Sequence, residues 1–322
     1  MKRTLITIVM TGTLTACNYH QHPHDHEHSH DEPVDISNVI FTKTAINCTE
    51  YADEYRSTAT DINENISYTG SLKITLENNK CIFSTNAIPN HDFNDGNRTF
   101  HNPVSEQSLT YTIPQSPRIS NNITPLSLRA DNAVFLNGVK LDLLAAGCFG
   151  VGDGFIGCGD TEQPFRFDPM SPLNNFGTDS HNAHTQPDGT YHYHGNPLAM
   201  FTASSEAISP VIGFAADGFP IYGSYFDDNG TIRKAKSSYI LKNKGGPREE
   251  VIYLGKTYSP GGHYDGQYVD DFEYDVLAGG DLDECNGMTV NGHYGYYVTD
   301  TYPWVLACFK GMPDESFNKR RR

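Results

Sequence analysis

Four histidines lie close together in one short stretch of the chain, around a turn signal. The stretch reads SHNAHTQPDGTYHYHGNP over residues 180–197, and its histidines are His181, His184, His192 and His194. Neutral imidazole is the commonest metal ligand among protein side chains. A single histidine is more often a structural residue held by hydrogen bonds, but four within one such stretch favour a metal site over that alternative.

The Pro-Asp-Gly triplet at residues 187–189 predicts a tight turn, because proline presets one backbone angle and glycine accepts a positive φ. A strand that follows this turn alternates its side chains between two faces. Tyr191 and Tyr193 then share one face of the strand. His192 and His194 share the other, with their Cα atoms about 6.6 Å apart.

His184 lies just before the turn, so a hairpin returns it to the side of His192 and His194. Imidazoles at this spacing can converge on one ion at a metal-to-nitrogen distance of about 2.0–2.1 Å. His181 joins this set on its position alone. Neutral imidazoles with few carboxylates in reach favour Cu or Zn over Mg or Ca. The sequence therefore predicts a Cu or Zn site.

A partial echo of this hairpin occurs later in the chain, in VNGHYGYYVT at residues 290–299. Tyr294 and Tyr296 follow a turn signal there as the two tyrosines do in the first hairpin. Gly295 and Tyr297 occupy the positions of the two histidines. The shared face indicates that the tyrosines build a sheet, while the histidines serve a separate task.

The elements that position these residues are predicted to be strands. From about residue 37 the chain shows short β-rich runs separated by Gly, Pro, Asn and Asp, and amphipathic helical patterns are scarce. Abundant Tyr and Phe with the single Trp304 suit sheets with one packed face. We therefore expect an all-β fold, a sandwich-like or sheet-rich single domain with long loops over residues 37–316, followed by a disordered basic tail at 317–322.

Six cysteines besides Cys17 predict disulfides that staple this domain, because an even number is typical of exported proteins. Six cysteines allow 15 connectivities. Pairing of nearest neighbours is favoured, because each pair then brackets one segment that contains turn signals. A cysteine metal site is the alternative, but no C-x-x-C spacing supports it. The predicted pairs are Cys48 with Cys81, Cys148 with Cys158, and Cys285 with Cys308.

The first 17 residues, MKRTLITIVMTGTLTAC, have the basic start and short apolar run of a secretory signal. Their last four residues resemble a bacterial lipobox, in which the cysteine, here Cys17, is acylated. This predicts a lipid-anchored protein of the bacterial cell envelope with the membrane as a partner, and Asn18 favours the outer membrane. An ordinary cleaved secretory signal is the alternative.

Residues 18–36 contain histidines at alternate positions and almost no apolar side chains. Such a segment is expected to be a disordered tether that collects Zn²⁺, Cu²⁺ or Ni²⁺, with a solvated spacer as the alternative. The net charge of −16 argues against nucleic acid as a partner, and the sequence identifies no protein partner. The histidines of the tether are His20, His22, His24, His26, His28 and His30.

Several blocks of the chain, spread over about residues 83–311, resemble the YHYH family, whose biochemical role is largely uncharacterised. The chain departs from the family pattern at HYGYYVT, where many relatives repeat the tetrapeptide. The similar blocks are STNAIPNH (84–91), FLNGV (135–139), DGTYHYHGNP (188–197), ADGFPIYG (216–223), DGQYVDDFEY (265–274) and GDLDECNG (280–287).

The resemblance implies His91, together with His184, His192 and His194, as the site histidines. It also implies three acidic residues as polar partners around that site, namely Asp217, Asp283 and Glu284. Asp217 could orient a ligating histidine, although an Asp-Gly pair is more often a turn. The acidic block GGDLDECNG lacks the spacing of known calcium loops, so its carboxylates are expected to cap turns.

These observations predict a lipid-anchored envelope protein that binds Cu or Zn through a histidine cluster. A metalloenzyme with an open coordination position is a second possibility. An extracellular recognition or adhesion module with structural histidines is a third. No nucleophile elbow is present, and oxidised cysteines do not supply a nucleophile.

Overall fold

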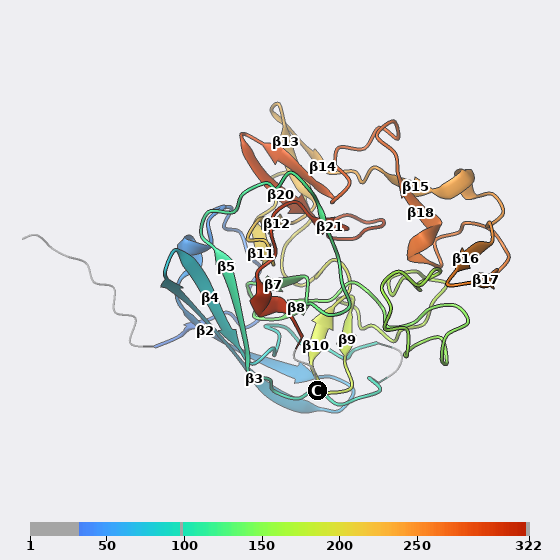
Figure 1. Ribbon diagram of the computed structural model, residues 1–322. Coiled ribbons are helices and arrows are strands. Elements are labelled where there is room, and N and C mark those ends of the chain that lie inside the picture. The colour runs from blue at the N-terminus through green and yellow to red at the C-terminus, as the bar shows by residue number, and fades with distance from the viewer. Residues whose placement is uncertain (1–31, 97–98, 320–322) are drawn as a thin grey trace, which may run out of the picture. The chain divides into compact units, whose positions relative to one another are not determined.

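The computed structural model describes residues 32–96 and 99–319. The signal segment, Cys17 and the histidines of the tether lie outside the described residues. From Pro33 onward the chain belongs to one compact unit, Pro33–Arg322 (Figure 1). Within residues 32–96 and 99–319, no helix combines the length and apolar character that crossing a membrane requires.

The N-terminal part of this unit is a five-stranded sheet with the order β1-β2-β3-β4-β5. Its strands alternate buried and exposed side chains, as expected for a sheet with one packed face. Asn78 and Asn79 form the two-residue loop between β3 and β4, and both have positive φ, which matches a tight hairpin turn. The strands are β1 (Val34–Asp35), β2 (Glu54–Asp61), β3 (Ile66–Glu77), β4 (Lys80–Thr85) and β5 (Leu109–Pro114).

The second part is an eight-stranded sheet with the order β19-β20-β12-β11-β7-β8-β10-β9. Several neighbouring strands of this sheet come from distant parts of the sequence, so backbone hydrogen bonds between distant segments hold the sheet together. Its strands are β7 (Ala133–Phe135), β8 (Lys140–Leu141), β9 (Ala183–Thr185), β10 (Tyr191–Tyr193), β11 (Val211–Ala215), β12 (Pro220–Tyr222), β19 (Gly287–Val290) and β20 (His293–Tyr297).

The eight-stranded sheet consists of two halves with the same topology. In the first half β7 and β8 form an antiparallel hairpin, and β8 pairs in parallel with β10 of the β9–β10 hairpin. In the second half β11 and β12 form the hairpin, and β12 pairs in parallel with β20 of the β19–β20 hairpin. The halves meet where β7 pairs antiparallel with β11, centred on Val134 and Phe214. This arrangement gives the sheet an approximate internal two-fold axis.

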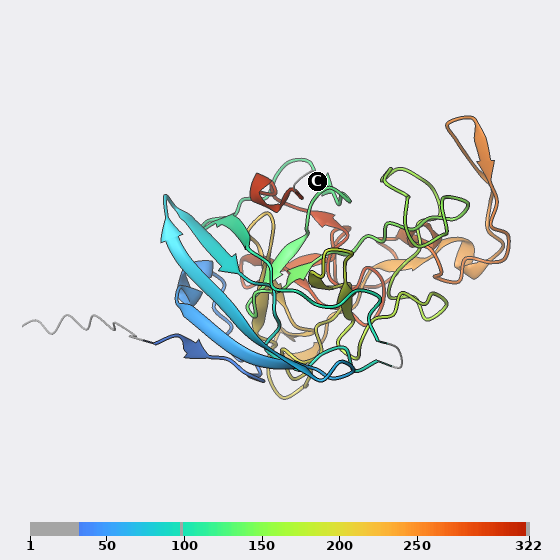
Figure 2. The same ribbon diagram turned by 90° about the horizontal axis from the view of Figure 1, so that it is seen from below.

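The two large sheets pack on one another around a shared hydrophobic core. Phe83 of β4 and Phe214 of β11 lie 6.1 Å apart between ring centroids, and both are fully buried. Side chains of β3, β4 and β5 belong to the same core cluster as those of β7, β11 and β12. The expectation of an all-β, sandwich-like fold is confirmed (Figure 2).

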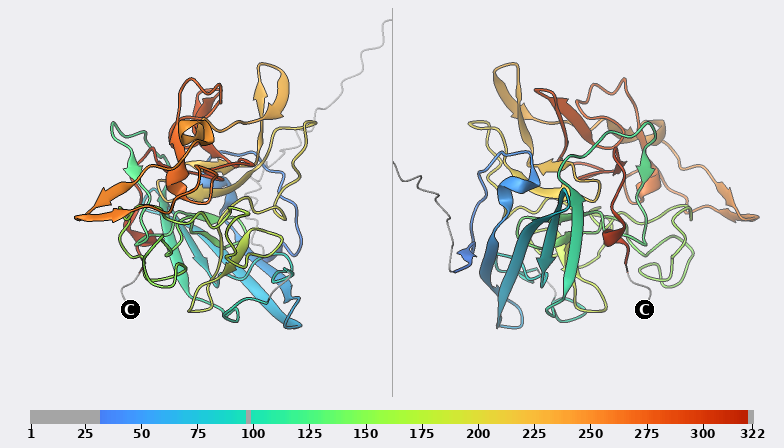
Figure 3. Two further views of the ribbon diagram at one scale, coloured as in Figure 1. Left: turned by 90° about the vertical axis from the view of Figure 1, so that its right-hand side faces the viewer. Right: turned by 60° about the vertical axis from the view of Figure 1, so that its left-hand side comes forward.

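Small two-stranded sheets and long loops surround this core (Figure 3). The β16–β17 hairpin extends furthest from the two large sheets in Figure 2. The pairs are β6 (Thr124–Pro125) with β21 (Cys308–Phe309), β13 (Tyr225–Asp228) with β14 (Thr231–Lys234), β15 (Tyr239–Leu241) with β18 (Phe272–Tyr274), and β16 (Val251–Tyr253) with β17 (Lys256–Tyr258). The 3-10 helices are η1 (Cys48–Tyr51), η2 (Lys242–Gly245), η3 (Val269–Asp271) and η4 (Glu315–Phe317).

The three predicted disulfides all form. Cys48 pairs with Cys81, which ties the loop before β2 to the five-stranded sheet. Cys148 pairs with Cys158 and closes a loop. Cys285 pairs with Cys308 and joins the segment before β19 to β21.

The folded unit extends closer to the C-terminus than expected. Phe317 is 1% exposed, and its ring stacks on Tyr111 at 4.6 Å between centroids. Lys319 donates to Asp142 at 2.5 Å. Residues 317–319, which we expected in a disordered tail, therefore belong to the folded unit, and residues 320–322 lie outside the described part.

Candidate metal centre

The predicted histidine hairpin is present as β9 and β10. His192 and His184 are direct partners across its antiparallel ladder. The turn between the strands includes Gly189 with φ of 80°, and a Cβ at this position would lie 2.3 Å from the Ser105 hydroxyl oxygen. Only glycine therefore fits the turn without rearrangement. The local sequence fixes the hairpin register, and this register brings the histidines together.

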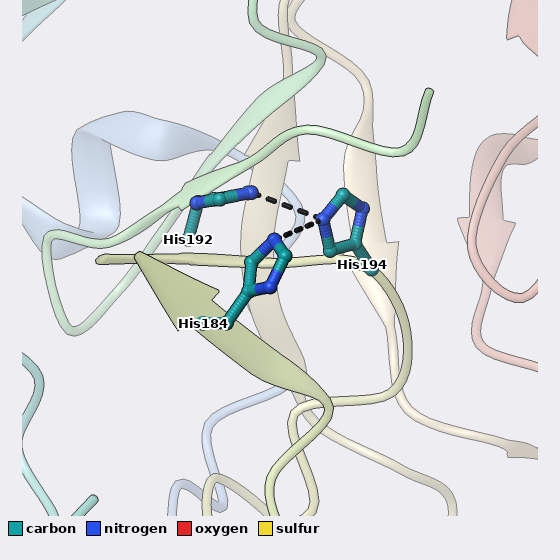
Figure 4. A group of neighbouring side chains, drawn as sticks. All are labelled: His184, His192 and His194. Carbon is teal, nitrogen blue, oxygen red and sulfur yellow. Dashed lines mark hydrogen bonds between the residues drawn. The ribbon is translucent and has the colours of Figure 1, made fainter. Parts of the chain in front are cut away.

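Three histidine side chains converge on the face of this hairpin opposite Tyr191 and Tyr193. The Nε2 atom of His194 lies 3.0 Å from Nε2 of His192 and 3.0 Å from Nε2 of His184. Each histidine offers a nitrogen within 4.8 Å of the other two. His192 and His194 are buried, and His184 is half-buried. Figure 4 shows the three rings pointing toward one another from β9, β10 and the residue after β10.

The hydrogen bonds of the Nδ1 atoms decide which nitrogens carry protons. His184 Nδ1 lies 2.7 Å from the Phe176 carbonyl oxygen. His192 Nδ1 lies 3.3 Å from the Thr190 carbonyl oxygen. A carbonyl oxygen only accepts hydrogen bonds, so both Nδ1 atoms donate and both Nε2 atoms hold lone pairs when the rings are neutral.

A neutral triad cannot satisfy both short contacts of His194. Its Nε2 faces two lone pairs, on His184 and His192, at 3.0 Å each. One N–H hydrogen can point at only one of them, so the other contact stays repulsive. A cation placed between the three nitrogens would satisfy all of them at once.

A proton does not readily supply this cation. Burial, followed by the neighbouring His184, lowers the pKa of His194 to about 3. Burial followed by the nearby imidazoles holds the pKa of His192 well below its usual value, and burial also lowers the pKa of His184. Neutral imidazole is the form that ligates a metal, so the site is prepared for a metal ion at neutral pH.

Two nitrogen spacings of the triad, both to Nε2 of His194, also fit a metal ion. Tetrahedral coordination at about 2.0–2.1 Å places neighbouring ligand nitrogens about 3.3–3.4 Å apart. The two contacts of 3.0 Å are within a few tenths of an ångström of this value. Backbone carbonyl groups that accept from Nδ1 orient the rings of His184 and His192, as is usual for metal-ligating histidines, whereas the buried Nδ1 of His194 has no hydrogen-bond partner among the described residues. The triad is therefore close enough to bind a metal.

A buried charged network adjoins the triad, and the sequence analysis did not identify it. Lys140 donates to Asp131 at 2.7 Å and to Gln186 at 3.0 Å. Asp142 accepts from Gln186 at 2.6 Å and from Lys319 at 2.5 Å. The side chains of Lys140 and Asp142 are each 4% exposed. Two charged residues in the otherwise apolar run GVKLDLL were the available signal.

The opposite charges of this network keep one another ionised. Burial alone would raise the pKa of Asp142, but Lys319 and Lys140 outweigh burial and hold it below the usual value. Burial alone would lower the pKa of Lys140, but Asp142 and Asp131 outweigh burial and raise it. Both side chains are therefore charged at neutral pH, next to three neutral imidazoles.

His91 and His181 lie on the tyrosine face of β10, apart from the triad. His91 Nε2 forms a hydrogen bond of 2.6 Å with the Tyr193 hydroxyl, and its Nδ1 lies 2.7 Å from the Asp92 carbonyl oxygen. The rings of His91 and His181 are 4.2 Å apart between centroids. Burial, followed by His181, lowers the pKa of His91 to about 4. The structure thus gives His91 a hydrogen-bonding role and does not bring it to the triad.

The three acidic candidates find other partners in the second half of the sheet. Asp217 accepts from the Tyr296 hydroxyl at 2.6 Å, rather than from a ligating histidine. Asp283 accepts from backbone N–H groups in its own turn, at 3.0 Å each, as expected for a capping carboxylate. Glu284 accepts from Lys310 at 2.6 Å.

Comparisons with known proteins concern the same part of the chain. No curated protein matches the sequence, and no solved structure matches it. The model of the family described as YHYH protein matches residues 110–311, which include both halves of the eight-stranded sheet and the complete triad. The chain therefore belongs to the YHYH protein family.

Proposed function

We propose that this protein binds one transition-metal ion, Zn²⁺ or a copper ion, through the Nε2 atoms of His184, His192 and His194. The observation that carries the proposal is the approach of Nε2 of His194 to Nε2 of His184 and of His192, at 3.0 Å each. The Nδ1 atoms of His184 and His192 are hydrogen-bonded to carbonyl groups, which leaves their Nε2 lone pairs facing His194. In the apo state one of the two contacts stays repulsive, and a bound cation makes both attractive.

The donor set supports this class of metal. Three neutral nitrogen donors suit borderline ions such as Zn²⁺ and Cu²⁺, whereas Mg²⁺ and Ca²⁺ require oxygen ligands. The nearby carboxylate of Asp142 is engaged by Lys319 and Gln186. The histidines are therefore the ligands, and the charged network acts on the ion from outside its coordination shell.

The cellular setting of the proposal rests on the sequence of the N-terminal segment. A signal sequence that ends in a lipobox-like Cys17 supports a lipid anchor in the bacterial cell envelope, with the outer membrane favoured. The alternating histidines of residues 20–30 support a weak collector of metal ions close to the membrane. In this arrangement the tether raises the local metal concentration and the triad retains one ion.

A metalloenzyme is the second candidate, and the number of ligands favours it. Structural zinc sites have four protein ligands, whereas catalytic sites have three and hold water in the fourth position. The group found here has three histidines. Addition of azide to the Cu²⁺-loaded protein tests this candidate, because an open position gives a new charge-transfer absorption band and a closed site does not.

Titration calorimetry with Zn²⁺ and Cu²⁺ tests the main proposal on the chain that begins at Pro33. This chain keeps β1, which lies within the segment expected to be a disordered tether, and excludes the histidines of the tether. We expect one ion per chain, and a loss of affinity of at least about a hundredfold when His192 and His194 are replaced by Ala. His293→Ala, an exposed histidine in the β19–β20 hairpin, is the matched control and should bind normally. Equal affinities of the wild type and the double variant would contradict the proposal and favour the recognition or adhesion module.

A further inference from the structure

The two halves of the eight-stranded sheet share side-chain hydrogen bonds as well as topology. In the first half the Asn137 side chain donates to the Tyr193 hydroxyl at 2.9 Å. In the second half the Tyr296 hydroxyl donates to the Asp217 side chain at 2.6 Å. Asn137 and Asp217 occupy the same position of the β7–β8 and β11–β12 turns, one residue before glycines with φ of 83° and 88°.

The second hairpin of each half is matched in the same way. Tyr191 donates to Asp179 at 2.8 Å, and Tyr294 donates to Asp283 at 3.2 Å. Each aspartate also accepts from the backbone N–H four residues further along, at 3.1 Å and 3.0 Å. Tyr191 and Tyr294 therefore have equivalent carboxylate partners, whereas Tyr193 and Tyr296 bond an amide and a carboxylate at the same turn position.

The backbone around the third histidine is also repeated. Asn182 has φ of 64° and accepts from the His194 N–H at 2.9 Å. Asn286 has φ of 68° and accepts from the Tyr297 N–H at 3.2 Å. His194 and Tyr297 are thus equivalent positions of one repeated framework.

The register identifies the counterparts of the other site residues. His192 pairs with His184 and Lys140, and its counterpart Gly295 pairs with Met288. Tyr193 pairs with Leu141, as Tyr296 pairs with Ile221. The counterparts of His184, His192, His194, Lys140 and Asp142 are therefore Met288, Gly295, Tyr297, Pro220 and Tyr222.

The second half serves as an internal control for the first. It builds the same hairpins, the same ladder and the same tyrosine hydrogen bonds without any of these five residues. In place of the polar site, Tyr222 stacks on Tyr297 at 4.9 Å between ring centroids, and the neighbouring Met288 packs against the same apolar cluster. The fold therefore does not require the triad, Lys140 or Asp142. Burial of the charges of Lys140 and Asp142 is moreover costly in free energy. Their presence in one half needs an explanation other than folding.

We propose that Asp142 is a positioning residue of the metal centre. Its negative charge lies behind the ligating histidines and stabilises the positive charge of the bound ion. This proposal rests on the proposed function. The Asp142 N–H donates to the carbonyl oxygen of Tyr193, the residue between His192 and His194, at 3.0 Å, and Lys140 is the direct ladder partner of His192. The network of Asp131, Asp142, Lys140 and Lys319 is neutral in total, so a divalent ion adds two uncompensated positive charges.

Two variants with opposite expected effects test the proposal, on the chain that begins at Pro33, which forms a compact unit by itself. Asp142→Asn removes a negative charge near the ion and should weaken Zn²⁺ binding roughly tenfold or more. Lys319→Met removes a positive charge near the same ion, on a side chain that is 27% exposed, and should strengthen binding about two- to threefold. Asp217→Asn, which removes a buried carboxylate from the second half and introduces the residue found at the equivalent first-half position, should bind as wild type.

The opposite signs separate electrostatic positioning from a structural role. If both variants weaken binding, or if neither changes it, while the wild type binds Zn²⁺, the positioning role of Asp142 is refuted and the proposed function stands. If the wild type itself binds no metal, the proposed function fails. If Asp142→Asn does not fold, as judged by circular dichroism, Lys319→Met decides alone, because tighter binding supports the proposal and unchanged or weaker binding overturns it.

Discussion

Acidification from pH 7.5 to pH 5 should weaken metal binding by the triad far less than metal binding by exposed histidines. Metal binding to histidine normally weakens in this range, because protons compete for the ligating nitrogens. In this protein, burial lowers the pKa values of all three histidines, and for His194 the value is about 3. His194 therefore stays neutral at a pH where exposed histidines are charged, and His184 and His192 are protonated less readily than exposed histidines.

The size of the difference follows from these pKa values. An imidazole with an ordinary pKa of 6.5 is about 97% protonated at pH 5, which weakens binding by each ligand about 30-fold and by three ligands about 3 × 10⁴-fold. An imidazole with the pKa of His194, about 3, is only about 1% protonated at pH 5. We therefore expect the dissociation constant of the buried triad to rise far less than that of three exposed histidines.

The assay is titration calorimetry with Zn²⁺ at pH 7.5, 6 and 5, in buffers that do not bind zinc. The reference is a synthetic peptide of residues 18–32, whose alternating histidines should lose zinc between pH 7 and pH 5. A thousandfold loss of affinity in the chain that begins at Pro33, parallel to that of the peptide, would refute the argument from burial.

The same pKa values predict how the stability of the apo protein depends on pH. His194 and His91 have folded-state pKa values of about 3 and about 4, below the unfolded value of about 6.5. Below pH 6.5 the unfolded chain binds protons that the folded chain excludes, so stability falls as the pH decreases. At pH 5 the loss is about 2 kcal/mol for each histidine. Urea unfolding of the apo chain at pH 7.5 and pH 5 measures it, and equal stability at both values would contradict it.

Three further predictions concern other parts of the chain. Tyr193→Phe removes the hydroxyl that bonds His91, so it should destabilise the protein by about 1–3 kcal/mol in urea unfolding yet leave zinc affinity unchanged, and weaker zinc binding would contradict this. Replacement of Cys148 and Cys158 by Ala opens a bridge with a sequence separation of 10, so it should destabilise the protein by about 2–3 kcal/mol in the same assay, and no loss would contradict this. Cys17→Ser should release the protein from membranes on centrifugation, whereas continued sedimentation would contradict the lipid anchor.

The sequence predicted the features that depend on local patterns. The Pro-Asp-Gly turn and strand alternation were enough to place His192 and His194 on one face, with His184 opposite them. The disulfide pairs followed from sequence proximity. These features involve residues close together in the chain, so composition and spacing determine them.

Features that depend on long-range packing could not be predicted in this way. His91 lies in a block that resembles the family, but the direction of its side chain depends on how the loop after β4 packs against the tyrosine face of β10. Lys140 and Asp142 were not identified, because nothing in the run GVKLDLL indicates a parallel pairing with β10. The repeated halves left only the tyrosine pattern as a local trace, because Pro220 and Tyr222 replace the charged residues of β8 and its end.

Anomalous diffraction from crystals of the zinc-loaded protein tests the central claim most directly. Data collected above and below the zinc absorption edge locate the ion without reference to the protein model. The account predicts one peak about 2.0–2.1 Å from the Nε2 atoms of His184, His192 and His194. A zinc peak elsewhere in the folded unit, with the three histidines bonded only to one another, would contradict it.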